Sequence, residues 1–217
     1  MLEAVVFDFD GVIVDSPTYY FKHMREFLKK LNKQVSDEHI SDLVGLTFSE
    51  KLSFINRTYG LNVKLEEFVS ATSGAMKIEM ASSISLDSSL QKFMEELDKN
   101  SIPMAIASNN NRKTIEYFLD ILGISNRFKL IVCADDGMNP KPAPDAYLRA
   151  VKMLGKNRVK CVAIEDTIVG VRAAKLAGLI CVAMPNKFST AHDFSEADLI
   201  TKGFGEISLK VLEGLLK

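Results

Sequence analysis

The sequence has little of what a thiolate metal site or a disulfide framework needs. It contains three cysteines and three histidines among 217 residues, with no Cys-x-x-Cys pair and no paired-histidine spacing. That scarcity argues against a zinc site. An odd number of cysteines in or beside predicted strands favours reduced, buried thiols. We therefore predict a cytoplasmic protein.

Long apolar runs and a strong charge of one sign are also missing. No apolar run approaches the ~20 residues of a membrane span, and Asp8 and Asp10 interrupt the apolar stretch near the amino terminus, unlike a signal peptide. The net charge of -1 gives no reason to expect nucleic acid or an anionic membrane as a partner. No G-x-x-x-x-G-K-[ST] loop is present, which disfavours a nucleotide triphosphatase of that class.

The most informative stretch that is present lies at residues 4–16. An apolar run rich in β-branched residues predicts a buried strand, and it ends at Asp8 and Asp10, two carboxylates one residue apart. Gly11 then lets the chain leave the sheet tightly. Two acids left bare at the mouth of a sheet would repel each other. The pattern therefore predicts that they meet a metal ion or a reacting group.

The remaining chain divides into a helical part and an alternating part. Residues 16–82 show apolar spacing typical of four helices, the last running from about residue 65 to residue 80, and no convincing strand. Further on, the predicted strands cover residues 103–107, 130–134, 159–164, 179–183 and, weakly, 199–200, and a final helix starts at residue 206. Strands that alternate with helices favour a parallel, doubly wound sheet.

The first strand belongs with that sheet, because alone it would leave its edges unpaired. We predict an α/β fold with a doubly wound, mostly parallel, Rossmann-like core at 1–15 and 83–217. A small helical cap domain at 16–82 is inserted after the first strand, and the connections near residues 14–17 and 82–87 would act as hinges.

Four predicted strand ends carry polar side chains. They are Asp8 with Asp10, Ser108 with Asn109, Lys141 in the loop after the 130–134 strand, and Glu165 with Asp166. Each motif alone has a plain structural explanation, since Ser-Asn is usually a turn and a lysine between prolines is usually exposed. Ligands of parallel sheets, however, bind beyond the carboxyl ends of the strands. The joint occurrence therefore predicts a single site.

The residue types in this set suit phosphoryl transfer. Carboxylates can hold Mg²⁺, which takes oxygen ligands and shares them with phosphate. Lys141 supplies positive charge, and Ser108 with the following N–H groups at a helix start suits phosphate oxygens. Asp8 can attack phosphorus to form an aspartyl-phosphate, while Asp10 protonates the leaving oxygen and later takes a proton from water.

The predicted site residues fall into three overlapping groups. The catalytic residues are Asp8, Asp10, Ser108 and Lys141. The metal residues are Asp8, Asp10, Glu165 and Asp166, with Mg²⁺ as the cofactor. The substrate-binding residues are Ser108, Asn109, Asn110 and Lys141, together with Tyr20 and Thr47 from the helical part.

In order and spacing these motifs resemble the haloacid dehalogenase-like hydrolases, specifically the branch of phosphoglycolate phosphatase and β-phosphoglucomutase. The resemblance covers the whole chain and rests on residues 8–16, 108–109, 141–145, 165–167, Gly170 and 173–178. It implies that Asp8 is the nucleophile and Asp10 the general acid/base. It also implies that Asp8, the Asp10 carbonyl and Asp166 bind Mg²⁺ beside Glu165, and that Ser108, Asn109 and Lys141 hold the phosphate. The inserted helices would form a mobile cap whose closure excludes water and selects the leaving group.

Two departures from the family favour a phosphatase over a mutase. Tyr20 stands where the mutase has a histidine, and Phe48 stands where it has an arginine that grips a second phosphate. Losing a guanidinium fork is not a conservative change. We therefore predict a monomeric phosphatase acting on a small phosphorylated metabolite of the sugar phosphate or phosphoglycolate type, with no nucleic-acid or membrane partner.

Three alternatives stay open. The first is a phosphomutase using the same intermediate. The second is a signalling or binding module that accepts phosphate on Asp8, as receiver domains do, although those domains have no inserted cap. Haloacid dehalogenation is the weakest, because it has no need of Asp10 or the Glu165–Asp166 pair.

Overall fold

The protein, described by a computed structural model over residues 1–216, forms two compact units. An α/β unit comprises Met1–Val14 and the chain from Ser85 onward, and a helical unit comprises Asp15–Ile84. These borders lie within two residues of the predicted ones. That the helical unit acts as a cap stays a prediction.

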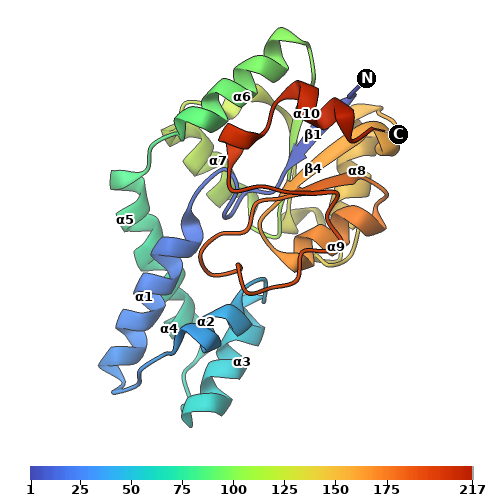
Figure 1. Cartoon of the computed structure of the whole chain (residues 1–217). Helices are drawn as coiled ribbons and strands as arrows, with labels where there is room; N and C mark the ends of the chain where they lie inside the picture. The colour runs from blue at the N-terminus through green and yellow to red at the C-terminus, as the bar shows by residue number, and fades with distance from the viewer. Residues whose placement is uncertain (217) are drawn as a thin grey trace. The chain divides into compact units, whose positions relative to one another are not determined.

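The α/β unit is built on a six-stranded parallel sheet (Figure 1). The strands are β1 (Ala4–Phe7), β2 (Met104–Ala107), β3 (Phe128–Val132), β4 (Cys161–Glu165), β5 (Ile180–Ala183) and β6 (Leu199–Ile200), in the spatial order β3-β2-β1-β4-β5-β6. The strand nearest the amino terminus is central, with Val5 opposite Met104 of β2 and Ala4 opposite Cys161 of β4. The predicted doubly wound, parallel fold is confirmed.

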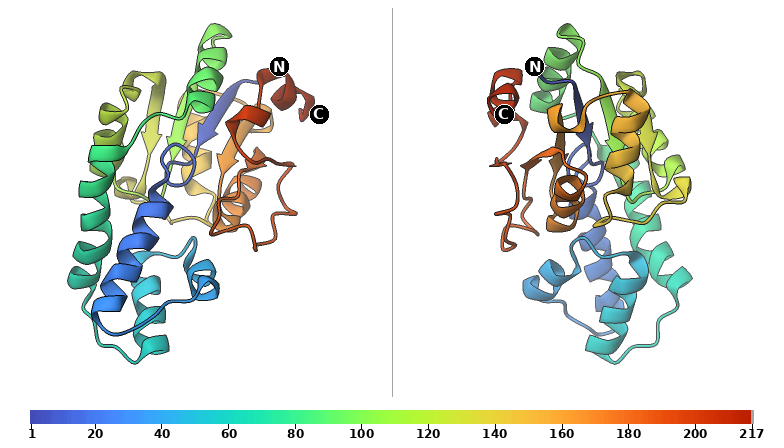
Figure 2. Two further views of the ribbon diagram at one scale, coloured as in Figure 1. Left: turned by 60° about the vertical axis from the view of Figure 1, so that its left-hand side comes forward. Right: turned by 90° about the vertical axis from the view of Figure 1, so that its right-hand side faces the viewer.

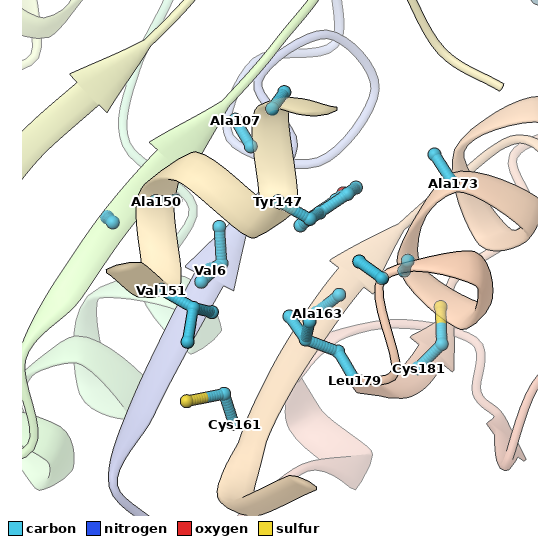
Figure 3. Packing of buried hydrophobic residues seen from close by; sticks show 14 of the residues in the cluster. Val6, Ala107, Tyr147, Ala150, Val151, Cys161, Ala163, Ala173, Leu179 and Cys181 are labelled. Carbon is cyan, nitrogen blue, oxygen red and sulfur yellow. The ribbon is translucent and has the colours of Figure 1, made fainter. Parts of the chain in front are cut away.

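Alternation along the strands sends buried side chains to both faces of the sheet. Ala4 and Val6 of β1 pack in a cluster with residues of α8 (Asp145–Leu154) and α9 (Ile168–Leu176), as Figure 3 shows for Val6 and its neighbours. On the other face Phe7 meets Phe93 of α6 (Ser88–Lys99), with ring centroids 6.2 Å apart. Helices cover both faces of the sheet (Figure 2), and because all its strands are parallel, their carboxyl ends lie along one edge.

Several predicted boundaries are shifted by short 3₁₀ turns. β3 spans 128–132 rather than 130–134, because the chain turns into a 3₁₀ segment at Ala134–Asp136, where the Asp136 carboxylate accepts from the Cys133 N–H. β4 begins at Cys161 because Val159 lies in the 3₁₀ turn Arg158–Lys160. The last helix, α10 (Leu209–Gly214), begins after Ser208, which caps it, and not at Glu206.

The helical unit contains α1 (Ser16–Lys30), α2 (Asp37–Leu43), α3 (Phe48–Tyr59), α4 (Leu65–Val69) and α5 (Ala75–Ser83). The single helix predicted near residues 65–80 is interrupted by a π-helical stretch, Ser70–Gly74. There the buried Thr72 hydroxyl donates to the Phe68 carbonyl at 2.7 Å, a side-chain bond that competes with the regular helical pattern. Among the described residues, no helix has the length and apolar character required to cross a membrane.

Candidate active site

Three buried carboxylates meet at the carboxyl edge of the sheet. Asp8 follows β1, Glu165 is the last residue of β4, and Asp166 comes next, so adjacent parallel strands bring them together. One oxygen from each lies within 4.8 Å of the others. All three side chains are buried. The sequence placed these residues at strand ends, and the folded chain gathers them at one point.

Lys141 bridges two of these acids. Its ammonium Nζ donates to Asp8 Oδ1 and to Glu165 Oε1, both at 2.6 Å. The loop that carries the lysine is anchored as well, because the Lys141 backbone N–H donates to Asn109 Oδ1 at 2.9 Å. Asn109, predicted to bind substrate, therefore ties the loop after β2 to the loop that holds the lysine.

Tyr147 of α8 completes this cluster, and it was not among the site residues expected from the sequence. Its side chain is fully buried, and its hydroxyl donates to Glu165 Oε1 at 2.6 Å. The Lys141 ammonium lies 4.9 Å from the centre of its ring. Figure 3 shows the Tyr147 side chain among the buried residues beneath α8. Tyr147 and Lys141 thus both bind one oxygen of Glu165.

Burial and mutual repulsion shift the pKa values of these groups. Burial, opposed by Lys141 and helped by Glu165 and Asp10, raises the pKa of Asp8 to about 7. Burial, with repulsion from Asp8 and Glu165, holds the pKa of Asp166 well above its usual range. Burial works against the charged form of Lys141, but attraction to Asp8 and Glu165 raises its pKa above the ordinary value, so it stays an ammonium.

The donor set fits a small, hard divalent cation. Three buried carboxylates face one ammonium, an excess of two negative charges when all three are ionised. Asp166 Oδ1 is buried and has no hydrogen-bond partner among the residues that the structure describes. Carboxylate oxygens are what Mg²⁺ prefers. Glu165 suits the ion less than Asp8 and Asp166 do, since its Oε1 accepts from Lys141 and Tyr147 and its Oε2 accepts from the Asp166 backbone N–H.

Asp10 and the loop after β2 form the neighbouring part of the site. Asn110 Nδ2 donates to Asp10 Oδ2 at 2.9 Å, and the Asn110 backbone N–H donates to Ser108 Oγ at 3.1 Å. Asn111 caps α7 (Arg112–Ile121) by accepting from Thr114 N–H. The buried Ser108 therefore lies just before a helix start, as predicted. Asn110, predicted to bind substrate, orients Asp10.

Two glycines let the main chain approach the acids closely. Gly11 has a φ of +83°, and a Cβ there would lie 1.9 Å from Asp166 Oδ2. A Cβ on Gly170, in the first turn of α9, would lie 2.0 Å from the Glu165 carboxyl group. Any side chain at either position would displace a carboxylate of the site.

The loop after β5 supplies two contacts that sequence reasoning missed. Asn186 Nδ2 donates to Asp166 Oδ2 at 2.7 Å, and Ser189 Oγ donates to the Asp166 backbone carbonyl at 2.9 Å. The sequence feature that could have predicted these two residues is the one that predicted the other site residues, namely polar residues after the carboxyl end of a strand. β5 is a further parallel strand, and polar residues follow its carboxyl end.

Two predicted substrate-binding residues, Tyr20 and Thr47, belong to the helical unit. The Tyr20 ring is buried and packs edge-on against Phe21 and Phe48, with the Lys51 ammonium 4.5 Å from its centre. Thr47 caps α3 through reciprocal hydrogen bonds with Glu50. Both side chains have structural roles inside this unit, and their contact with substrate stays a prediction.

A model of the haloacid dehalogenase-like hydrolase family matches residues 5–184, which is most of the chain. The protein is therefore a hydrolase. It belongs to the haloacid dehalogenase-like hydrolases, and its phosphatase-named relatives support an enzyme of the phosphatase type.

Three curated relatives illustrate this family. The bifunctional riboflavin kinase/FMN phosphatase of Arabidopsis thaliana is 30% identical over 95% of this chain, which spans 55% of that longer protein. The putative phosphatase YhcW of Bacillus subtilis is 26% identical over 98% of this chain and 96% of its own. The phosphorylated carbohydrates phosphatase of Thermotoga maritima is 26% identical over 82% of each chain.

Solved structures share the whole fold. CbbY from Rhodobacter sphaeroides in complex with phosphate superposes with a TM-score of 0.83 at 24% identity, covering 98% of this chain and 100% of that one. β-Phosphoglucomutase from Clostridium difficile superposes with a TM-score of 0.82 at 24% identity, covering 100% and 97%. At these identities the likeness concerns the fold alone.

Proposed function

We propose that this enzyme is a Mg²⁺-dependent phosphatase that hydrolyses a small phosphomonoester through an aspartyl-phosphate on Asp8. The observation that carries the proposal is the buried group of Asp8, Lys141, Glu165 and Asp166 at the carboxyl edge of the sheet. Asp8, the Asp10 carbonyl and Asp166 would hold the ion. When bound, Mg²⁺ would neutralise charge on the phosphoryl oxygens.

The residues of the chain divide the chemistry between them. Lys141 holds Asp8 through Oδ1 and keeps it oriented for attack on phosphorus. Asp10, oriented by Asn110, protonates the leaving oxygen and then takes a proton from the water that hydrolyses the aspartyl-phosphate. Ser108 and the N–H groups that follow it would bind the phosphoryl oxygens.

The substrate class rests on the relatives together with the sequence. The named relatives act on FMN and on phosphorylated carbohydrates, which are small phosphomonoesters. We propose a sugar phosphate or phosphoglycolate type of substrate, with the helical unit as a cap that selects the leaving group. The proposal keeps the monomeric state and the cytoplasmic location expected from the sequence.

Replacing the nucleophile tests the proposal. Asp8→Asn should abolish phosphate release from a phosphomonoester panel with Mg²⁺, whereas Asp120→Asn, an exposed change on α7, should leave it unchanged. EDTA should stop wild-type turnover and Mg²⁺ should restore it. Turnover by the Asp8→Asn variant would refute the assignment. Bisphosphate-dependent isomerisation would show a mutase instead, and a long-lived aspartyl-phosphate without turnover would show a signalling module.

A further inference from the structure

The two oxygens of the Asp166 carboxylate have different surroundings. Oδ2 accepts a hydrogen bond from Asn186 Nδ2 at 2.7 Å, whereas Oδ1 is buried without a partner among the described residues. The orientation of the amide is fixed from its other end, because Asn186 Oδ1 accepts from the Phe188 backbone N–H at 2.8 Å. A flipped amide would lose both bonds. The NH₂ group of Asn186 therefore faces Asp166.

Further contacts close the Oδ2 side. The fully buried Ser189 donates from Oγ to the Asp166 carbonyl and accepts from the Asn186 N–H at 3.0 Å, which fixes the loop against Asp166. The backbone of Gly11 lies against the same oxygen, since a Cβ there would come within 1.9 Å of Oδ2 but 3.3 Å of Oδ1. A cation can thus use Oδ1, while Oδ2 is occupied.

This asymmetry bears on which cation the site accepts. Ca²⁺ takes six to eight oxygens at ~2.3–2.6 Å and readily binds both oxygens of a carboxylate, whereas Mg²⁺ demands a compact octahedron at ~2.0–2.1 Å. We propose that Asn186 restricts Asp166 to one-oxygen ligation and thereby favours Mg²⁺ over Ca²⁺. Asn186 acts through Asp166 and is a positioning residue. The inference rests on the proposed function, because it concerns the ion which that function requires.

Cation competition on the free, full-length protein tests this inference without reference to turnover. Mn²⁺ binding is followed by the electron paramagnetic resonance signal of the unbound ion, and Mg²⁺ or Ca²⁺ is titrated to displace it. In Asn186→Ala the ratio of the Ca²⁺ to the Mg²⁺ dissociation constant should fall about tenfold or more. Removing a hydrogen-bond partner of a metal ligand typically changes metal affinity by ~10–100-fold, which sets this scale. Asn157→Ala, which loses a cap on the 3₁₀ turn before β4, should keep the wild-type ratio.

The outcomes distinguish a failure of this inference from a failure of the proposed phosphatase function. A wild-type protein that binds Mg²⁺ and hydrolyses phosphomonoesters, with an unchanged ratio in Asn186→Ala, overturns the inference alone. A wild-type protein that binds neither cation overturns the metal-dependent function and the inference together. Asn186→Leu keeps the volume without the donor, and circular dichroism confirms folding. The folded Asn186→Leu variant should show the same fall in the ratio of the Ca²⁺ to the Mg²⁺ dissociation constant. A wild-type ratio in this variant would also overturn the inference.

Discussion

Replacing Lys141 by methionine should destabilise the metal-free enzyme, and the loss should depend on pH. The ammonium bonds Asp8 and Glu165 at 2.6 Å each, and its side chain is 5% exposed. Removing one partner of a buried ion pair leaves uncompensated charge and costs about 3–5 kcal/mol. For a chain of this length, each kcal/mol lowers the melting temperature by roughly 2–4 °C. At pH 8 we therefore expect a drop of roughly 6–20 °C.

The sign of the pH dependence follows from the raised pKa of Asp8, which is about 7 in the folded protein against 3.8 for the free group. A carboxyl whose pKa is raised on folding binds more protons in the native state, so its stabilising effect is present at low pH and lost as pH rises through 7. The Lys141 ammonium lowers the pKa of Asp8, so its loss in the variant should raise that pKa further. At pH 5 the variant can therefore protonate Asp8, and the destabilisation should be clearly smaller than at pH 8.

The measurement is thermal unfolding followed by circular dichroism in EDTA at pH 5 and pH 8. Lys160→Met is the matched control, because Lys160 pairs with Glu3 at 3.5 Å with 49% of its side chain exposed. Exposed pairs are worth at most about 1 kcal/mol. Equal losses for Lys141→Met at the two pH values would refute the reasoning, and so would a loss no larger than that of the control.

Two further substitutions test the contacts around the site. Tyr147→Phe removes a buried hydrogen bond to a carboxylate and should lower the free energy of unfolding by about 1.5–3 kcal/mol in urea denaturation at pH 8. Tyr117→Phe, on the exposed face of α7, should change the free energy of unfolding little. Equal effects of the two substitutions would contradict the role of the Tyr147 hydroxyl. Gly11→Ala should weaken Mg²⁺ binding and turnover at least tenfold, because the new Cβ would displace Asp166. Gly155→Ala, with a similar positive φ but open space around its Cβ, should retain both, and a matching loss there would mean that backbone strain alone is responsible.

The central part of the site could be predicted because sequence pattern and topology agree there. Apolar strands ending in polar residues are visible locally, and parallel pairing places all their carboxyl ends on one edge. The positions of Asp8, Glu165 and Asp166 in the fold follow from that rule alone. The proximity of the three acids is then a consequence of β1 and β4 being neighbours, whereas Lys141 reaches them from the loop after β3.

The supporting contacts could not be predicted, since they depend on side-chain geometry. Tyr147 has helical apolar spacing, and nothing in that spacing shows that its hydroxyl reaches Glu165. The position of Asn186 after the carboxyl end of β5 is visible in the sequence, but the irregular loop does not show that its amide reaches Asp166. Asn109 and Asn110 follow β2, and nothing in their sequence position shows that their side chains contact the Lys141 backbone N–H and the Asp10 carboxylate. Their contact with substrate stays a prediction.

The central place of β1 in the sheet has a consequence for how the chain acquires its structure during synthesis. β1 pairs with strands that begin at Met104 and Cys161, so about a hundred residues must follow it before its first partner exists. The helical unit, Asp15–Ile84, is synthesised completely before then, so its internal contacts can form while β1 still has no partner strand. We expect the growing chain to fold the inserted unit first, while the strand that carries the nucleophile waits for its neighbours.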